Sequence, residues 1–212
     1  MGLLNLLFPP KCVFCGKILK AGQRDICPGC ADNLPYTEGR AKQGRGDFFD
    51  VCVSPLYYRG IVRESFLRYK FSGKRSYAPV YGRMLAACVR EHLGEFDLIT
   101  WVPVSKRRLR ERGYDQSELL CSFMAAELGK ESTALLKKIK ENPAQSSLVG
   151  AEKRRANVLG AYKVLSPEKA AGKRILLVDD IFTTGATLSE CARTLLMAGG
   201  ESVVCATFAR KE

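Results

Sequence analysis

The sequence predicts an α/β protein with an open, mostly parallel sheet and flanking helices, preceded by a small N-terminal ribbon with four cysteines. Short apolar runs without polar alternation, such as residues 175–178, are typical of strands buried on both faces. Apolar residues at helical spacing follow this run, as in a strand–helix unit of a parallel sheet. Two Cys-x-x-Cys pairs near the N-terminus predict the ribbon.

The length of 212 residues favours one domain with a small appendage. We predict that residues 1–46 form an N-terminal helix, the ribbon and a linker, and that residues 47–212 form the α/β domain. The short helix would dock on the protein and end at Pro9 and Pro10; its apolar residues are Leu3, Leu4, Leu6 and Leu7.

Composition and charge narrow the class of protein. Hydrophobic residues make up 46% of the chain and charged residues 26%, which is typical of a soluble globular protein, and no apolar run reaches membrane-spanning length. The net charge of +12 favours anionic partners, either nucleic acid or phosphorylated small molecules. Nine cysteines without a signal sequence indicate a reducing compartment, so we predict a cytoplasmic protein.

Four cysteines near the N-terminus have the spacing of a structural zinc site. Each Cys-x-x-Cys pair can turn two thiolates toward one metal ion, and two pairs complete a tetrahedron without an open position. The alternative is a set of four buried or redox-active thiols. The predicted zinc ligands are Cys12, Cys15, Cys27 and Cys30. We predict that the other five thiols are core residues: Cys52, Cys88, Cys121, Cys191 and Cys205.

The remaining elements follow in chain order. A linker or loop over 37–47 leads to strands and helices that end with a strand over 202–208, which we expect to close the sheet. Residues 142–157 mix turn formers with cations and suit a mobile lid that excludes water. We predict strands over 51–58, 97–104, 134–139 and 162–165, and helices over 61–70, 77–92 and 114–128.

The stretch from residue 174 to 189 carries the chemistry. Asp179 and Asp180 directly follow the apolar run, so we place them at the strand's end, facing solvent or a ligand. A small hydroxyl-rich turn then opens a helix whose N-terminus attracts a phosphate. Carboxylates can accept from ribose hydroxyls, so one turn can hold a sugar phosphate. The alternative is an ordinary strand–helix turn with a threonine cap. The turn residues are Thr183, Thr184, Gly185, Ala186 and Thr187.

A second segment adds positive charge at the same edge of the predicted sheet. Residues 105–113 follow the strand over 97–104, and ligands of open α/β sheets lie at the carboxyl ends of strands. We therefore predict a cationic loop that binds pyrophosphate through Arg forks and a Lys. A solvated basic loop is the alternative. The proposed pyrophosphate ligands are Ser105, Lys106, Arg107 and Arg108.

These motifs support a resemblance to known families. Residues 178–187, Val-Asp-Asp-Ile-Phe-Thr-Thr-Gly-Ala-Thr, resemble the phosphoribosyl-pyrophosphate signature of type I phosphoribosyltransferases. The resemblance implies the fold of the type I phosphoribosyltransferases. It also implies that Asp179 and Asp180 hold the ribose hydroxyls and that residues 183–187 hold the 5-phosphate. The whole chain is similar to the ComF family through its four-Cys ribbon, Val102–Val104, Arg108–Gln116, Gln145–Leu148, Arg154–Tyr162 and the phosphate turn.

The ComF resemblance also implies partners. This chain departs from the family's usual pattern at Tyr114, a mild change from phenylalanine, and at two further positions. The family is linked to DNA uptake in competent bacteria, which implies single-stranded DNA, a competence helicase and a DNA-loading protein as partners. Asp115 stands where an asparagine is usual, and Ala156 stands where a glutamate is usual. These differences leave the hydrogen-bonding role of residue 115 open.

Two functions remain open at this point. The first is a phosphoribosyltransferase, with Asp179 and Asp180 as catalytic residues and Mg²⁺ bound together with phosphoribosyl pyrophosphate. The second is an accessory module that binds single-stranded DNA or assists a helicase, in which the phosphoribosyl site is regulatory or inactive. Fold alone does not distinguish them.

Overall fold

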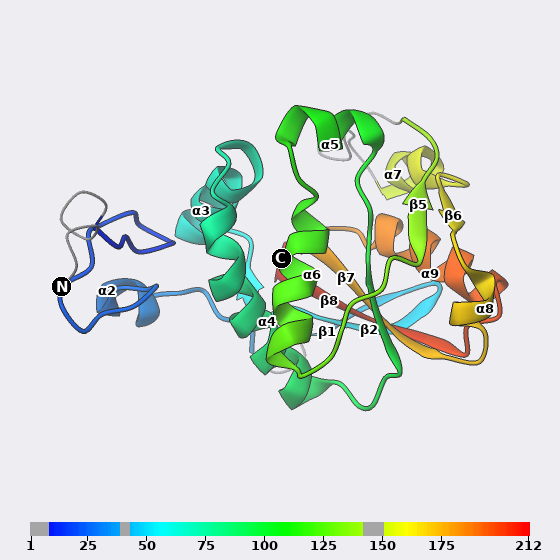
Figure 1. Cartoon of the computed structure of the whole chain (residues 1–212), viewed down its shortest axis with the longest axis horizontal. Helices are drawn as coiled ribbons and strands as arrows, with labels where there is room; N and C mark the ends of the chain where they lie inside the picture. Colours follow the sequence, from blue (N-terminus) through cyan, green and yellow to red (C-terminus); the bar gives the residue numbers. More distant parts are fainter. Residues whose placement is uncertain (1–8, 39–42, 142–150) are drawn as a thin grey trace.

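The computed structural model describes residues 9–38, 43–141 and 151–212 (Figure 1). The helix predicted within residues 1–8 and most of the predicted lid, including Gln145–Leu148, lie outside these ranges. Residues 151–157 of the predicted lid lie in helix α7 (Ala151–Val158).

A mostly parallel sheet forms the centre of the molecule, as predicted. Its strands lie in the order β1 (Gln43–Gly46), β2 (Phe49–Val53), β8 (Ser202–Arg210), β7 (Arg174–Phe182) and β4 (Leu98–Trp101). The short strand β3 (Leu56–Tyr57) also pairs with β8. Only the β1–β2 pair of this sheet is antiparallel. Strands β5 (Leu136–Lys138) and β6 (Tyr162–Val164) form a separate antiparallel pair.

Three predictions about the sheet are wrong. Strand β8 does not close the sheet, because it lies between β2 and β7. Residues 43–46 are not linker, because they pair with β2 as an edge strand. The carboxylates of Asp179 and Asp180 do not follow the end of β7, because the strand continues to Phe182. The predicted domain boundary after residue 46 stays a prediction. It would separate β1 from β2, although the two strands pair with each other.

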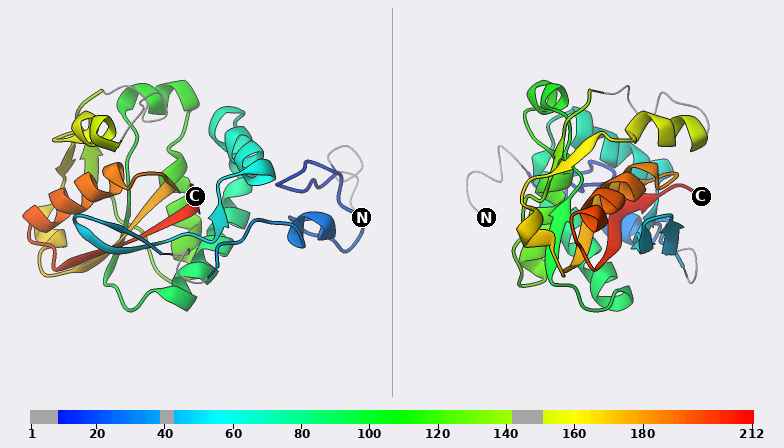
Figure 2. Two further views of the ribbon diagram at one scale, coloured as in Figure 1. Left: turned by 180° about the vertical axis from the view of Figure 1, so that it is seen from behind. Right: turned by 90° about the vertical axis from the view of Figure 1, so that its right-hand side faces the viewer.

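Helices cover both faces of the sheet (Figure 2). Alternate residues of β7 point to opposite sides, as the period of a strand requires. Leu176 and Val178 pack in the cluster that contains α3 (Gly60–Phe71), α4 (Ala78–His92) and α6 (Gln116–Glu127), whereas Ile175 and Leu177 pack in the cluster with α9 (Ala186–Met197). Two further short helices are α2 (Pro28–Ala31) and α8 (Pro167–Ala170).

The predicted cationic loop is a helix. Residues 106–112 form α5 (Lys106–Arg112), whose N-cap is Ser105 and which ends at Gly113 with a φ of 74°. A serine cap and a terminal glycine are ordinary helix boundaries, and the Arg, Lys and Glu residues between them favour helix. The five remaining thiols are buried, as predicted.

Within the described ranges, no helix combines the length and the apolar character that crossing a membrane requires.

Candidate functional site

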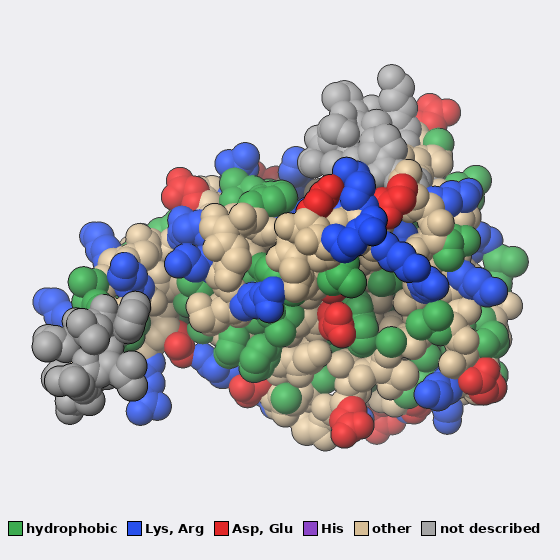
Figure 3. Space-filling model, turned by 45° about the horizontal axis from the view of Figure 1, so that its top comes forward, with side chains coloured by type: hydrophobic (Ala, Val, Ile, Leu, Met, Phe, Trp, Pro, Cys, Tyr) green, Lys and Arg blue, Asp and Glu red, His purple; other side chains and the backbone are tan. Residues whose placement is uncertain are grey.

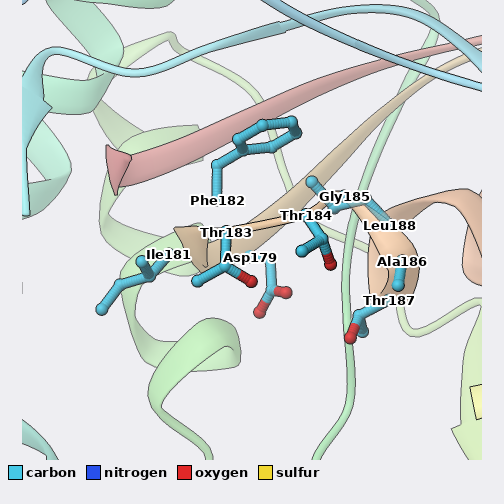
Figure 4. A pocket seen from close by; sticks show the side chains of 9 residues that line it. All are labelled: Asp179, Ile181, Phe182, Thr183, Thr184, Gly185, Ala186, Thr187 and Leu188. Carbon is cyan, nitrogen blue, oxygen red and sulfur yellow. The ribbon is translucent and has the colours of Figure 1, made fainter. Parts of the chain in front are cut away.

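The turn between β7 and α9 forms a small pocket. Gly185 is the N-cap of α9 and adopts a φ of 72°, a left-handed conformation that favours glycine. A Cβ at this position would lie 3.2 Å from the Phe182 ring. Residues 181–188 line the pocket together with Asp179, and Figure 4 shows hydroxyl and carboxylate oxygens around it. The first N–H groups of α9 add partial positive charge, so the pocket suits a phosphate beside hydroxyl groups.

The two adjacent aspartates have different surroundings. Asp180 forms an ion pair with Lys70 of α3 and accepts a 2.7 Å hydrogen bond from the Ile181 N–H. Asp179 accepts hydrogen bonds from the Ser117 hydroxyl at 3.1 Å and from the Asp180 N–H at 2.8 Å. Burial, followed by the neighbouring Asp180 charge, raises the pKa of Asp179 to about 8. Burial therefore favours the protonated form of Asp179, while Asp180 pairs with a lysine.

The raised pKa of Asp179 predicts a pH-dependent stability. A carboxyl group with a raised folded-state pKa stabilises the fold fully below its unfolded pKa, and this contribution is lost as the pH rises toward about 8. We expect Asp179→Asn, measured without ligand, to unfold at a higher temperature than wild type at pH 8 but at an equal temperature near pH 4. Because the residue stays partly exposed, the expected gain is about 2 kcal/mol, or about 6 °C. A difference in melting temperature that does not change with pH would contradict this assignment.

The cationic helix α5 reaches the same edge of the sheet as the aspartates. Strands β4 and β7 are parallel neighbours in which Trp101 pairs with Val178, and the Val102 N–H donates to the Val178 carbonyl at 2.9 Å. The chain therefore leaves β4 directly beside Asp179 and enters α5. Lys and Arg side chains gather on this face of the molecule (Figure 3).

Asp115 fixes the geometry of this edge. Its Oδ2 accepts the Val104 N–H at 2.8 Å, while its Oδ1 accepts the N–H groups of Ser117 and Glu118 at 2.9 and 3.2 Å. The side chain thus caps α6 and holds the segment that precedes α5. Burial raises the pKa of Asp115 to about 6, although these donors oppose the shift. Both carboxylate oxygens of Asp115 accept from backbone N–H groups, whereas an asparagine at this position would offer only one acceptor oxygen.

The four predicted pyrophosphate ligands differ in their surroundings. Ser105 is buried, and its hydroxyl accepts the Arg108 N–H at 3.4 Å as the cap of α5. Lys106 is exposed, whereas Arg107 pairs with Glu111 and Glu141. Arg108 is half-buried, and its charge helps to lower the pKa of Lys138 and of Arg112, behind the larger effect of burial. Arg108 is therefore the least exposed of the three predicted cations, and its charge acts on Lys138 and Arg112.

Sequence reasoning missed two lysines and one serine at the site. Lys70 and Ser117 contact the aspartates directly. Lys138 of β5 stands over the Tyr162 ring at 5.4 Å, and burial lowers its pKa, with Arg108 as the next cause. In the sequence, Lys70 ends a predicted helix and begins a basic segment, and this position could have indicated a residue that binds anions. Lys138 had no such signal, because its partners come from strands distant in the chain.

The four ribbon cysteines converge as predicted. Their Sγ atoms all lie within 4.8 Å of one another, and those of Cys15 and Cys27 are 3.6 Å apart. A tetrahedral zinc site with bonds of about 2.3 Å separates its sulfurs by about 3.8 Å, so the arrangement fits zinc. Burial raises the pKa of Cys12, but N–H groups from Cys15, Cys27 and Phe14 outweigh it and bring the value to about 7. Burial and the three neighbouring thiols instead raise the pKa of Cys30, so the lowered pKa favours a thiolate at Cys12 alone before a metal ion is bound.

Comparisons with known proteins agree with both parts of this architecture. A phosphoribosyl transferase domain model matches residues 115–212, and a double zinc ribbon domain model matches residues 3–42. Among solved structures, glutamine phosphoribosylpyrophosphate amidotransferase from B. subtilis is 21% identical with a TM-score of 0.46, covering 66% of this chain and 30% of that chain.

Curated relatives match along most of the chain. Competence protein ComFC of Streptococcus pneumoniae is 30% identical over 199 residues, which cover 91% of this chain and 84% of the relative. DNA utilization protein YhgH of Escherichia coli is 27% identical, with coverage of 91% and 86%, and competence protein F of Haemophilus influenzae is 26% identical, with coverage of 91% and 93%. A zinc ribbon followed by a phosphoribosyltransferase domain, together with this extent of similarity, shows that the chain belongs to the ComF family.

Proposed function

We propose that this protein binds phosphoribosyl pyrophosphate with Mg²⁺ and acts in DNA uptake in the cytoplasm. One observation carries the phosphosugar proposal. Asp179 and the Thr183–Thr187 turn line one pocket, and the chain that leaves β4 beside Asp179 enters α5, a helix rich in cations. The DNA-uptake role rests on relatives that are named for competence and DNA utilization.

Each part of the site suits one part of the ligand. The turn and the first N–H groups of α9 would hold the 5-phosphate, while Asp179 and Asp180 would bind the ribose hydroxyls. The cations at and after residue 105 would bind the pyrophosphate, with Arg108 contributing most. Carboxylate oxygens are the protein donors here that suit Mg²⁺, which binds mainly to substrate phosphates and water.

The same groups suit transfer of the pentose. Pyrophosphate would leave the anomeric carbon with the electron pair of the broken C–O bond, and an acceptor nitrogen would attack that carbon. The cations would stabilise the negative charge that develops on pyrophosphate. No separate nucleophile is required, because positioning and electrostatics can provide the rate enhancement.

Isothermal titration with phosphoribosyl pyrophosphate and Mg²⁺ tests the binding. We expect Asp180→Asn to bind at least about tenfold more weakly than wild type, because it loses a charged acceptor and the partner of Lys70. Asp97→Asn is a matched control, since this exposed aspartate pairs with Arg174 at the other end of the sheet. Equal affinities for wild type and Asp180→Asn, or no binding by wild type, would remove the proposal.

Binding of single-stranded DNA is the second candidate, favoured by the net charge of +12 and by the five cations within α5. A helicase and a DNA-loading protein are the corresponding protein partners. Backbone contacts predict affinity that falls steeply with salt. Adding phosphoribosyl pyrophosphate to the same DNA titration distinguishes a shared surface from a separate one, because only a shared surface gives competition. DNA binding that is absent or insensitive to salt removes this candidate.

A further inference from the structure

Helix α3 contacts both the metal ribbon and the aspartate pair. Ser65 and Arg68 bind the backbone of the first cysteine pair, and Lys70 forms the ion pair with Asp180. Figure 1 and Figure 2 both show α3 between the ribbon and the rest of the α/β body. A single helix therefore joins the zinc site to the proposed phosphosugar site.

The ribbon end of this connection is buried and specific. Val13 and Phe14, which lie between Cys12 and Cys15, are almost fully buried. The Ser65 hydroxyl donates to the Val13 carbonyl, and Arg68 donates to the Phe14 carbonyl. These carbonyls belong to the segment between two proposed ligands of one metal ion, so metal binding would hold that segment in shape. The position of α3 would then depend on the metal-bound form of the ribbon.

Arg68 lacks a carboxylate partner within the described ranges. Its Nη2 donates only to backbone carbonyls, and its buried Nε has no hydrogen-bond partner there. Four thiolates around one Zn²⁺ carry net negative charge. A loaded zinc site would therefore supply negative charge near Arg68, for which the described ranges offer no other counter-charge. Partial burial strengthens such an attraction, because less water screens the two charges.

The other end of α3 is fixed to the aspartate pair by two routes. Lys70 contacts Asp180 directly. The Tyr69 hydroxyl donates to the Gln116 carbonyl at 2.8 Å, and the Tyr114 hydroxyl donates to the Tyr69 carbonyl. These contacts join α3 to the start of α6, where Ser117 binds Asp179. A shift of α3 would therefore move groups that hold both carboxylates.

We propose that metal loading of the ribbon positions Lys70 for the phosphosugar through α3, with Arg68 as the positioning residue that transmits it. Lys70 holds Asp180 in the free protein and binds ligand phosphate when Asp180 turns to the ribose. This inference rests on the proposed function. Coupling between two binding sites is reciprocal. If zinc raises the affinity for the phosphosugar by some factor, the phosphosugar must raise the affinity for zinc by the same factor.

The test uses the full zinc-loaded chain and two titrations. Phosphoribosyl pyrophosphate with Mg²⁺ is titrated calorimetrically, and zinc affinity is measured by competition with a chromogenic chelator, with and without that ligand. We expect the ligand to raise wild-type zinc affinity about fivefold to tenfold. Arg68→Ala should lose this gain and bind the ligand about fivefold to tenfold more weakly. Arg63→Ala, an exposed arginine of the same helix, should behave as wild type.

Lys70→Gln separates positioning from folding. The variant should keep the zinc affinity of the free protein but lose both its affinity for the ligand and the ligand-dependent gain in zinc affinity. Any change in zinc affinity that the ligand still causes in this variant reports zinc chelated by the ligand itself, and it can be subtracted from the wild-type value. If Arg68→Ala does not fold, Ser65→Ala removes one hydrogen bond to Val13 and should weaken the coupling less strongly. The coupling is overturned if Arg68→Ala binds the ligand as tightly as wild type does and shows the same ligand-dependent gain in zinc affinity. That outcome leaves the proposed function intact. Wild type that binds no phosphosugar overturns both.

Discussion

Replacing Gly185 by valine should weaken binding of phosphoribosyl pyrophosphate about 100-fold or more while leaving the zinc content unchanged. Gly185 has a φ of 72°, and a β-branched residue in this conformation costs about 1–3 kcal/mol. Its Cβ would also lie 3.2 Å from the Phe182 ring, which limits relief of the strain. The turn must therefore shift, and its hydroxyl and N–H groups would lose their common orientation toward the phosphate. Calorimetric titration with Mg²⁺ present measures the loss.

Gly172→Val is the matched control for this prediction. Gly172 also has a positive φ, of 63°, but it lies in the turn before β7, and a Cβ there would meet nothing within 4 Å. The control should lose stability from the same backbone strain while retaining ligand affinity. If both variants bind equally well, the turn at Gly185 does not form the phosphate site. If both lose affinity equally, the effect reflects general instability of the fold.

The local sequence patterns predicted the parts of the site that depend on neighbouring residues. The apolar run before Asp179, the small residues after it and the apolar spacing of α9 together define one strand–turn–helix unit. The cysteine pairs likewise predicted their own convergence, because the spacing within each pair turns two thiolates toward one point. In both cases the interaction that determines the structure acts over a few residues.

The missed features depend on residues far apart in the chain. Lys70 of α3 pairs with Asp180 of β7, and Lys138 of β5 stands against Tyr162 of β6, only because the tertiary fold brings these elements together. Strand β8 looked like a closing edge because local pattern does not encode strand order. Strand β1 is rich in glycine, which resembles a linker. However, a Cβ at Gly44 would lie 2.7 Å from the Phe182 ring, so close packing explains that glycine.

Removal of zinc should have the largest effect on stability. A structural zinc site contributes about 10–16 kcal/mol of binding free energy in small zinc domains, and that free energy orders the ribbon. Val13 and Phe14 of the first cysteine pair are buried with residues of α3 and α4 in one core cluster. Releasing these two side chains should cost the α/β domain about 4 kcal/mol, or about 10 °C in melting temperature.

Cys12→Ser tests this prediction without a chelator. We expect wild type to contain one zinc ion per chain, and we expect the variant to lose the metal, to melt about 10 °C lower and to be cleaved first within the ribbon by a protease. Cys205→Ser is the matched control, since this thiol is buried in β8 and should not change the zinc content. A Cys12→Ser protein that keeps both its melting temperature and its ribbon resistant to protease would mean that the ribbon folds without metal. The contacts of Val13 and Phe14 would then be stable on their own, and α3 would be held in place whether or not zinc is bound.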